Sequence, residues 1–282
     1  MIKTTLKDFL GFIIKPDDRQ IDLTVKSKLY VVLILFGLIG ILSIVIIDPL
    51  LTLVSEMVPM SYNQYAYLTW QTSILLYVIL VPLAEELFFR YFLRYNGLKT
   101  TFITQKKWTK IFPGLVYVSV ICFGLVHLWN YSNRTTLFYL LSPLIILSQL
   151  AGGFILSYLR VRFNFLWGVL FHAMWNLTIF IIPYVSYSST DAYSEKALNY
   201  TVTIEQELFF DEEKQRMKID SVGDKIIFIN AEHYSVQHIL DTLYRKGRYV
   251  AEDELINLNF KSKDGVTKDA FIKILQKELE IQ

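Results

Sequence analysis

Five stretches of this chain are long and apolar enough to cross a membrane as helices. A hydrocarbon core of about 30 Å is crossed by roughly 20 helical residues. The composition agrees, because 53% hydrophobic and 19% charged residues in a chain of 282 residues is too apolar for an ordinary soluble domain. The stretches are residues 29–47, 68–93, 111–129, 137–159 and 163–185. We therefore expect an all-α polytopic membrane core of about five transmembrane helices over residues 29–185, in which the second stretch is one helix or two helices broken at Pro82.

Residues 1–28 are polar and mixed in charge, unlike a cleaved signal peptide, so we expect them to remain as a cytoplasmic N-terminal segment. Within this segment Leu6, Phe9, Leu10 and Ile13 recur at helical spacing among lysines. This pattern is typical of a short helix that lies on the membrane surface. A frayed tail fits the same residues equally well.

Lysines and arginines are concentrated in alternate connections between the apolar stretches. Residues 1–28 hold six and residues 90–110 hold six, whereas residues 48–66 hold none and the third connection holds only Arg134. Short loops rich in Lys and Arg stay in the cytoplasm. We therefore expect an integral protein of a bacterial cytoplasmic membrane, with the N-terminus inside and, after five crossings, the C-terminus outside.

Residues 186–282 differ from the rest of the chain, because charge returns and the apolar runs shorten to the lengths of strands and soluble helices. Alternating apolar residues over 200–210, and apolar runs at 224–230 and 254–260, predict three strands. Ser235 and Thr267 can cap two amphipathic helices. We predict a small extracytoplasmic α+β domain whose partner is unknown. Its 13 basic residues against 18 acidic ones form no basic stripe, so we expect no nucleic-acid binding.

Two adjacent glutamates, Glu85 and Glu86, interrupt the second apolar stretch. A carboxylate deep in a bilayer costs about 2.5 to 3.5 kcal/mol and is normally paired or functional. Glu86 lies four residues before Arg90, which predicts an ion pair on one helical face. Glu85 lies five residues before Arg90, about 140° away around the helix, so it has no such partner.

Two histidines and one asparagine in the apolar stretches accompany these glutamates. His127 lies in the third stretch, and His172 lies one turn before Asn176 in the fifth. At about 1.5 Å per residue, all three reach depths similar to that of Glu85, which lies roughly 20 Å from the cytoplasmic boundary. A buried carboxylate can take a proton from water, and imidazole and carboxamide donors can hold the oxyanion that forms at a peptide carbonyl. The only cysteine, Cys122, does not share a helical face with His127, so we expect attack by water rather than by a thiolate.

These residues occur in the segments EELFFR, FGLVH and HAMWN, which have the patterns EExxxR, FxxxH and HxxxN. In this order, over residues 81–177, they resemble the CPBP family of intramembrane glutamic endopeptidases, which includes the type II CAAX prenyl proteases and the Abi proteins linked to bacteriocin immunity. The resemblance implies that Glu85 activates water, that His127 positions it, and that His172 and Asn176 donate to the oxyanion. It implies supporting roles for Glu86 and Arg90 and no cofactor.

The expected activity is therefore hydrolysis of a peptide bond in a membrane-associated protein or peptide. One alternative is a zinc-dependent membrane protease, because His127, His172 and Glu85 could form a three-ligand site with an open position. The chain lacks the HExxH pairing that would place two histidines one turn apart. A second alternative is a non-catalytic membrane scaffold or immunity protein, in which the same polar side chains join helices by hydrogen bonds.

Overall fold

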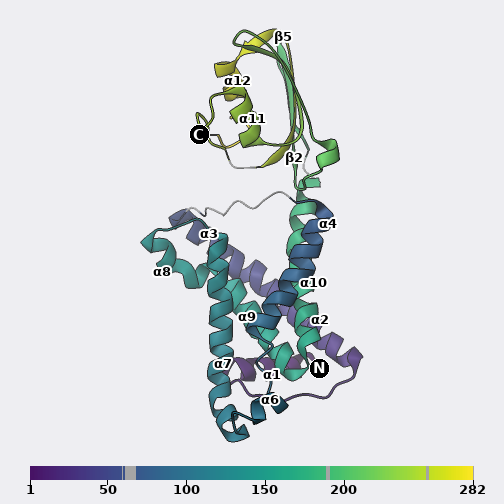
Figure 1. Cartoon of the computed structure of the whole chain (residues 1–282), viewed down its shortest axis with the longest axis vertical. Coiled ribbons are helices and arrows are strands. Elements are labelled where there is room, and N and C mark those ends of the chain that lie inside the picture. The colour runs from purple at the N-terminus through teal and green to yellow at the C-terminus, as the bar shows by residue number, and fades with distance from the viewer. Residues whose placement is uncertain (59, 61–67, 189–190, 252–253, 282) are drawn as a thin grey trace. The chain divides into compact units, whose positions relative to one another are not determined.

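The computed structural model describes residues 1–58, 60, 68–188, 191–251 and 254–281 (Figure 1). Its contacts divide the chain into two compact units. The first comprises Met1–Asn63 with Ile74–Thr178, and the second comprises Gln64–Ser73 with Ile179–Gln282. The boundary that we predicted between residues 185 and 186 stays a prediction.

The described residues up to 188 form helices and the short connections between them. In order, the elements are α1 (Ile2–Ile14), α2 (Val25–Leu42), η1 (Ser43–Ile47), α3 (Asp48–Met57), α4 (Trp70–Ser73), η2 (Ile74–Leu80), α5 (Val81–Phe89), α6 (Gly97–Thr100), α7 (Gln105–Val126), η3 (His127–Asn130), α8 (Thr136–Ile145), α9 (Leu147–Arg162) and α10 (Phe165–Ser188). Of these, η1 and η2 are π-helical and η3 is a 3₁₀ turn.

Among the described residues, five helical spans are long and apolar enough to cross a membrane, which confirms the predicted membrane core. They are Val25–Met57, Trp70–Phe89, Gln105–Asn130, Thr136–Arg162 and Phe165–Ile182. The second span continues through Pro82, which lies in the first turn of α5. Large apolar side chains such as Ile44, Leu140 and Leu166 are exposed on these helices, as expected for surfaces that face lipid.

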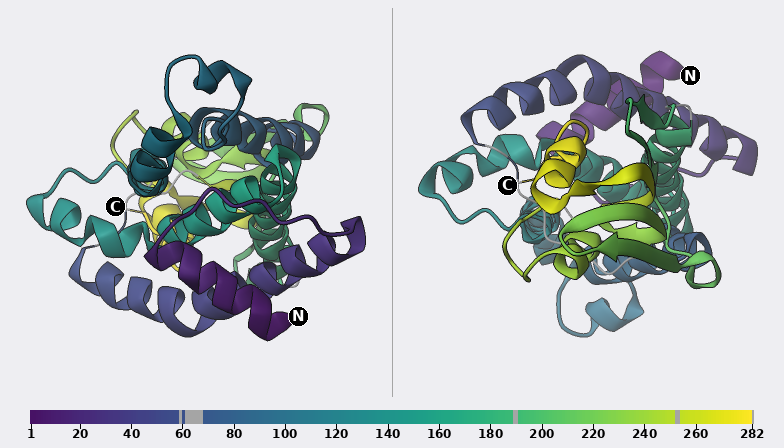
Figure 2. Two further views of the ribbon diagram at one scale, coloured as in Figure 1. Left: turned by 90° about the horizontal axis from the view of Figure 1, so that it is seen from below. Right: turned by 90° about the horizontal axis from the view of Figure 1, so that it is seen from above.

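The N-terminal segment forms the helix α1 and packs against the other helices. Phe9 and Phe12 are buried, and their rings meet the ring of Tyr158 on α9 edge to face at 5.4 Å and 5.6 Å. In the view from below in Figure 2, α1 crosses the end of the helical unit. Of the apolar residues that indicated a surface helix, Phe9 is buried and Leu10 is exposed.

The second unit contains a five-stranded antiparallel sheet with the strand order β1-β2-β5-β4-β3. Two helices, α11 and α12, pack on one face of it (Figure 1). This arrangement confirms the predicted α+β domain. The elements are β1 (Tyr193–Lys196), β2 (Tyr200–Glu207), η4 (Glu212–Lys214), β3 (Arg216–Val222), β4 (Lys225–Ser235), α11 (Val236–Leu243), β5 (Leu255–Thr267) and α12 (Lys268–Leu275).

Both predicted caps and all three predicted strands are present, with shifted ends. The Ser235 hydroxyl accepts a hydrogen bond from the backbone N–H of His238, and Thr267 accepts one from Ala270. Strand β2 ends at Glu207, before the end of the predicted alternation, whereas β4 and β5 run several residues longer than expected. The edge strands β1 and β3 were not predicted, because their outward residues are charged and they have few apolar positions.

Candidate active site

The two glutamates lie on α5, directly after the π-helical stretch η2. Glu86 is buried, with 1% of its side chain exposed, and its Oε1 accepts a hydrogen bond from Nη1 of Arg90 at 3.0 Å. The i,i+4 ion pair predicted from the sequence is therefore formed. Glu85, on the neighbouring face, keeps 21% of its side chain exposed. The two carboxylates thus have different environments, one enclosed and paired with arginine and the other accessible.

Arg90 and Glu86 fit into spaces that two glycines provide. The guanidinium of Arg90 lies 3.7 Å from the centre of the Phe123 ring, a cation–π contact inside the protein. A Cβ atom at Gly153 would lie 3.4 Å from Nη2 of Arg90, and one at Gly168 would lie 3.1 Å from Oε2 of Glu86. A larger residue at Gly168 would therefore press on Glu86, whereas at Gly153 a Cβ atom would reach Arg90 only at an ordinary contact distance and would lie closer, at 3.2 Å, to Cγ1 of Val120.

We expect Gly168→Ala to lower the thermal stability of the protein. The new methyl group would meet a carboxylate that cannot easily move, and overpacking of this kind costs about 1 to 3 kcal/mol. Gly152→Ala on α9 is the matched control, because nothing lies within 4 Å of its Cβ position and alanine favours a helix by about 1 kcal/mol. Thermal unfolding in detergent compares the two variants. Equal stability of both variants would contradict the close approach at Gly168.

His172 lies between the two glutamates. It is buried on α10, with Nδ1 at 3.1 Å from Oε1 of Glu86 and Nε2 at 3.4 Å from Oε2 of Glu85. The carboxylate of Glu86, paired with Arg90, only accepts hydrogen bonds when it is ionised, so this contact requires the tautomer of His172 in which Nδ1 donates. This contact fixes the orientation of the ring and directs Nε2 toward Glu85.

His127 follows α7 directly, as the first residue of η3. Its Nδ1 lies 2.8 Å from the backbone carbonyl of Phe123 and donates to it, since a carbonyl can only accept. In the neutral ring, Nε2 is then the nitrogen that accepts a hydrogen bond. The ring of Phe123 contacts those of His127 and His172, with centroids 4.7 Å and 5.8 Å away. Phe123 therefore packs against both histidines, and against Arg90 as well, a role that the four-residue spacing to His127 alone did not indicate.

Asn176 makes a different contact. Its Nδ2 donates a hydrogen bond of 2.8 Å to the backbone carbonyl of Tyr77 in η2. The structure therefore brings Glu85, Glu86, Arg90 and His172 into direct contact, and it holds Asn176 against the helix that leads into Glu85. The backbone of Tyr77 had no part in the predicted site, because no side-chain pattern identifies a carbonyl group.

The zinc alternative requires a cluster of three ligands. Within the described part of the chain, no three histidine, cysteine, aspartate or glutamate side chains are grouped so as to hold a metal ion. The proposed ligands Glu85 and His172 are in contact, and His127 packs against Phe123, whose ring also contacts that of His172. Whether the site works with or without metal stays a prediction.

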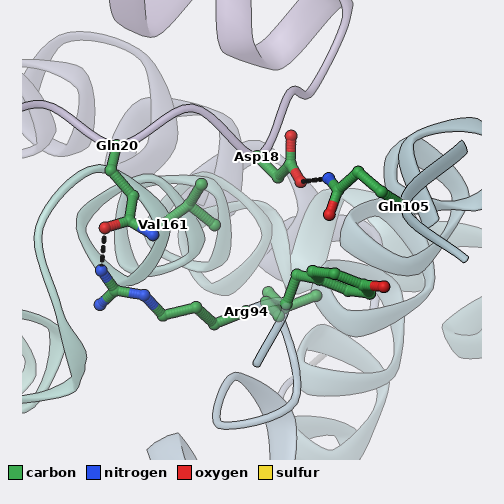
Figure 3. Close-up of a pocket in the computed structure, with 7 residues that line it drawn as sticks. Asp18, Gln20, Arg94, Gln105 and Val161 are labelled. Atoms are coloured by element: carbon green, nitrogen blue, oxygen red, sulfur yellow. Dashed lines mark hydrogen bonds between the residues drawn. The ribbon is translucent and has the colours of Figure 1, made fainter. Parts of the chain in front are cut away.

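A separate cavity of about 350 Å³ lies at the ends of several helices (Figure 3). In Figure 3 the amide of Gln105 donates to the carboxylate of Asp18 at 3.1 Å, and Arg94 donates to Gln20. These bonds connect the segment between α1 and α2 to the helix ends. None of the residues around the cavity belongs to the predicted site; they are Asp18, Gln20, Leu93, Arg94, Tyr95, Gln105 and Val161.

Comparison with known proteins supports the resemblance deduced from the three motifs. Residues 67–178 match the family described as type II CAAX prenyl endopeptidase Rce1-like. The matched range contains every residue of the predicted site, namely Glu85, Glu86, Arg90, His127, His172 and Asn176. No curated protein and no solved structure matches the chain significantly. The resemblance to the CAAX-protease family is thereby confirmed over these residues.

Proposed function

We propose that this CAAX-protease-like membrane protein is an intramembrane endopeptidase that uses Glu85 to activate water. The family match supports a membrane protease. The observation that carries the proposal is the contact of His172 with both carboxylates, because one of them is enclosed by Arg90 and the other is accessible. Such a pair separates a supporting carboxylate from a reactive one.

Glu85 is the better candidate for the base. A general base needs access to water and must not be held by a permanent positive charge. Glu86 is buried and bonded to Arg90, whereas Glu85 is partly exposed, makes its contact with the ring of His172 and forms no salt bridge with Arg90 in the structure. A proton on Nε2 of His172 would leave Glu85 free to act as the base and would bring the net charge of Glu85, Glu86, Arg90 and His172 to zero, which lowers the cost of placing the group in a membrane.

In the proposed reaction, Glu85 takes a proton from water as the water oxygen attacks the peptide carbonyl. The resulting oxyanion is held by the N–H of Asn176 that is not bonded to Tyr77 and by His172, which donates from Nε2 in its doubly protonated form. Glu85 then returns the proton to the amine as the C–N bond breaks. The acceptor nitrogen of His127 suits it to orient the attacking water.

Cleavage assays on the purified protein in liposomes test this proposal. The substrates are a library of membrane peptides together with farnesylated peptides that end in a CAAX sequence. The cleavage rate of each is measured with the unaltered protein and with a Glu85→Ala variant. In water enriched in ¹⁸O, we expect one heavy oxygen in the new carboxylate of each product. A variant that cleaves as fast as the unaltered protein would refute the role of Glu85, and a complete lack of cleavage would favour the scaffold alternative.

Metal removal distinguishes the two protease mechanisms. If Glu85 activates water without a metal, the cleavage rate after exhaustive chelation should be within about twofold of the rate before it, because no metal contributes to the transition state. Elemental analysis of the active protein should then find less than one zinc per chain. Loss of cleavage on chelation, with recovery on addition of zinc, would establish the zinc alternative instead.

We also propose that the N-terminus lies in the cytoplasm and that residues 186–282 lie outside the membrane of a bacterial cell, where they contact a substrate or another protein. The distribution of Lys and Arg among the short connections supports this orientation. A protease added to spheroplasts should cleave within residues 191–282 and leave an N-terminal tag intact. Protection of both ends until the membrane is permeabilised would show that the number of crossings is even.

A further inference from the structure

The π-helical stretch η2 ends at Leu80, two residues before Pro82. In a π-helix, the carbonyl of one residue accepts a hydrogen bond from the N–H five residues further along. For Tyr77, which lies inside η2, that residue is Pro82. Proline has no N–H. The donor that π-helical geometry requires for the Tyr77 carbonyl is therefore missing from the backbone.

A side chain from another helix donates to this carbonyl. Nδ2 of Asn176, on α10, lies 2.8 Å from the oxygen of Tyr77, which is 99 positions earlier in the chain. Figure 1 shows the helix that contains η2 and α5 running beside α10. Because a carbonyl only accepts, the contact also settles which end of the carboxamide faces Tyr77. The nitrogen does, and one of its two N–H groups remains for another partner.

Asn176 lies one helical turn after His172, which contacts Glu85 and Glu86. We propose that Pro82 and the Tyr77 carbonyl are positioning groups for Asn176: the proline keeps the carbonyl available, and the carbonyl holds the carboxamide in the rotation that directs its second N–H toward the oxyanion. This inference rests on the proposed function, in which Asn176 is an oxyanion donor. π-helical turns are frequent at functional sites. Here the turn precedes a proline, and the pairing of the two leaves the Tyr77 carbonyl without a π-helical donor.

The same hydrogen bond could act only as a tie between helices, and kinetics separate the two roles. A tie of this kind contributes roughly 0.6 kcal/mol to stability in a membrane protein and should not affect the chemical step. A positioning group changes kcat, because the oxyanion donor must be in place before the charge develops. It should affect KM little, since the contact exists before substrate binds.

The test introduces an N–H at residue 82. In Pro82→Ala this N–H competes with Asn176 for the Tyr77 carbonyl, and we expect kcat to fall about tenfold while KM changes less than about twofold. The probe is the peptide from the cleavage library that the unaltered protein cleaves fastest. Pro143→Ala is the matched control, because Pro143 is also inside a helix, α8, and is exposed. Its kcat should be unchanged. If the alanine variant folds poorly, Pro82→Val is used instead, because it introduces the same N–H and its side chain replaces more of the volume of the proline ring.

A double-mutant cycle shows whether Pro82 acts through Asn176. Asn176→Ala should lower kcat about 100-fold, the usual effect of losing one oxyanion donor. In that background Pro82→Ala should add less than about a twofold further loss, because the group that it positions is gone. If the two losses multiply, or if Pro82→Ala alone leaves kcat unchanged, the positioning role is wrong.

A spectroscopic measurement tests the inference without activity. With ¹⁵N-labelled asparagine, the side-chain amide resonance of Asn176, assigned by its absence in Asn176→Ala, should shift in Pro82→Ala and not in Pro143→Ala. An unchanged resonance would refute the inference even if the protein is a protease. If neither the unaltered protein nor any variant cleaves a peptide, the proposed function fails. A shift of this resonance would still show that Pro82 controls the Asn176 contact.

Discussion

Glu85→Gln should reduce peptide cleavage by about 100- to 10,000-fold, the range attributed to general acid–base catalysis, while the protein stays folded and inserted. The amide has the shape of the carboxylate but cannot take a proton from water. Because Glu85 is partly exposed and does not contact Arg90 in the structure, the substitution should leave the Glu86–Arg90 pair in place. Cleavage is measured as an initial rate in liposomes, and folding as the thermal transition in detergent.

Glu56→Gln is the control for this experiment. Glu56 is exposed on α3, far along the sequence from the three motifs, so the same chemical change there should leave both the rate and the stability unaltered. A Glu85→Gln variant that retains the full cleavage rate would exclude Glu85 as the base. A variant that loses activity only in proportion to a loss of folded protein would indicate a structural role instead.

Glu86→Gln should have the largest effect on stability. It leaves the fully buried guanidinium of Arg90 without its counter-charge and weakens the acceptor for Nδ1 of His172. Breaking a buried ion pair on one side costs about 3 to 5 kcal/mol. Thermal unfolding should therefore occur at a clearly lower temperature than in the unaltered protein or in Glu56→Gln.

The double variant Glu86→Gln with Arg90→Met separates the ion pair from simple packing. It removes both charges, so it should be more stable than the sum of the two single losses predicts. Additive losses would mean that Arg90 and Glu86 contribute independently. Full stability of Glu86→Gln alone would contradict the burial and pairing of this carboxylate.

The membrane core and the Glu86–Arg90 pair could be predicted because their causes are local. In a bilayer every backbone polar group must be satisfied within the helix, so a long apolar stretch is sufficient to predict a span. A spacing of four places two side chains on one helical face, and the pair is present at 3.0 Å. Positions 85, 127, 172 and 176 were selected by chemistry and by motif, and their catalytic roles stay predictions.

The side-chain contacts between helices could not be predicted, because they depend on how α5, α7 and α10 pack. Depth along a helix predicted that the polar residues meet, but it did not show that His172 lies between both glutamates. It also did not predict that His172 and Asn176 make different contacts. Asn176 is about 6 Å further along the same face and bonds to Tyr77, whereas His172 contacts the glutamates.

By itself, the sequence determined which helices are apolar and long enough to span a membrane, the α+β character of the C-terminal region and the ion pair, because hydropathy, period and spacing act within one element. Only the tertiary structure decided that Phe123 packs against both histidines and Arg90, and that the carbonyl of Tyr77 accepts a hydrogen bond from Asn176. The contacts of Phe123 with Arg90 and His172 and the contact of Tyr77 with Asn176 join residues 33 to 99 positions apart, so they arise from helix packing, and no local pattern of residues encodes them.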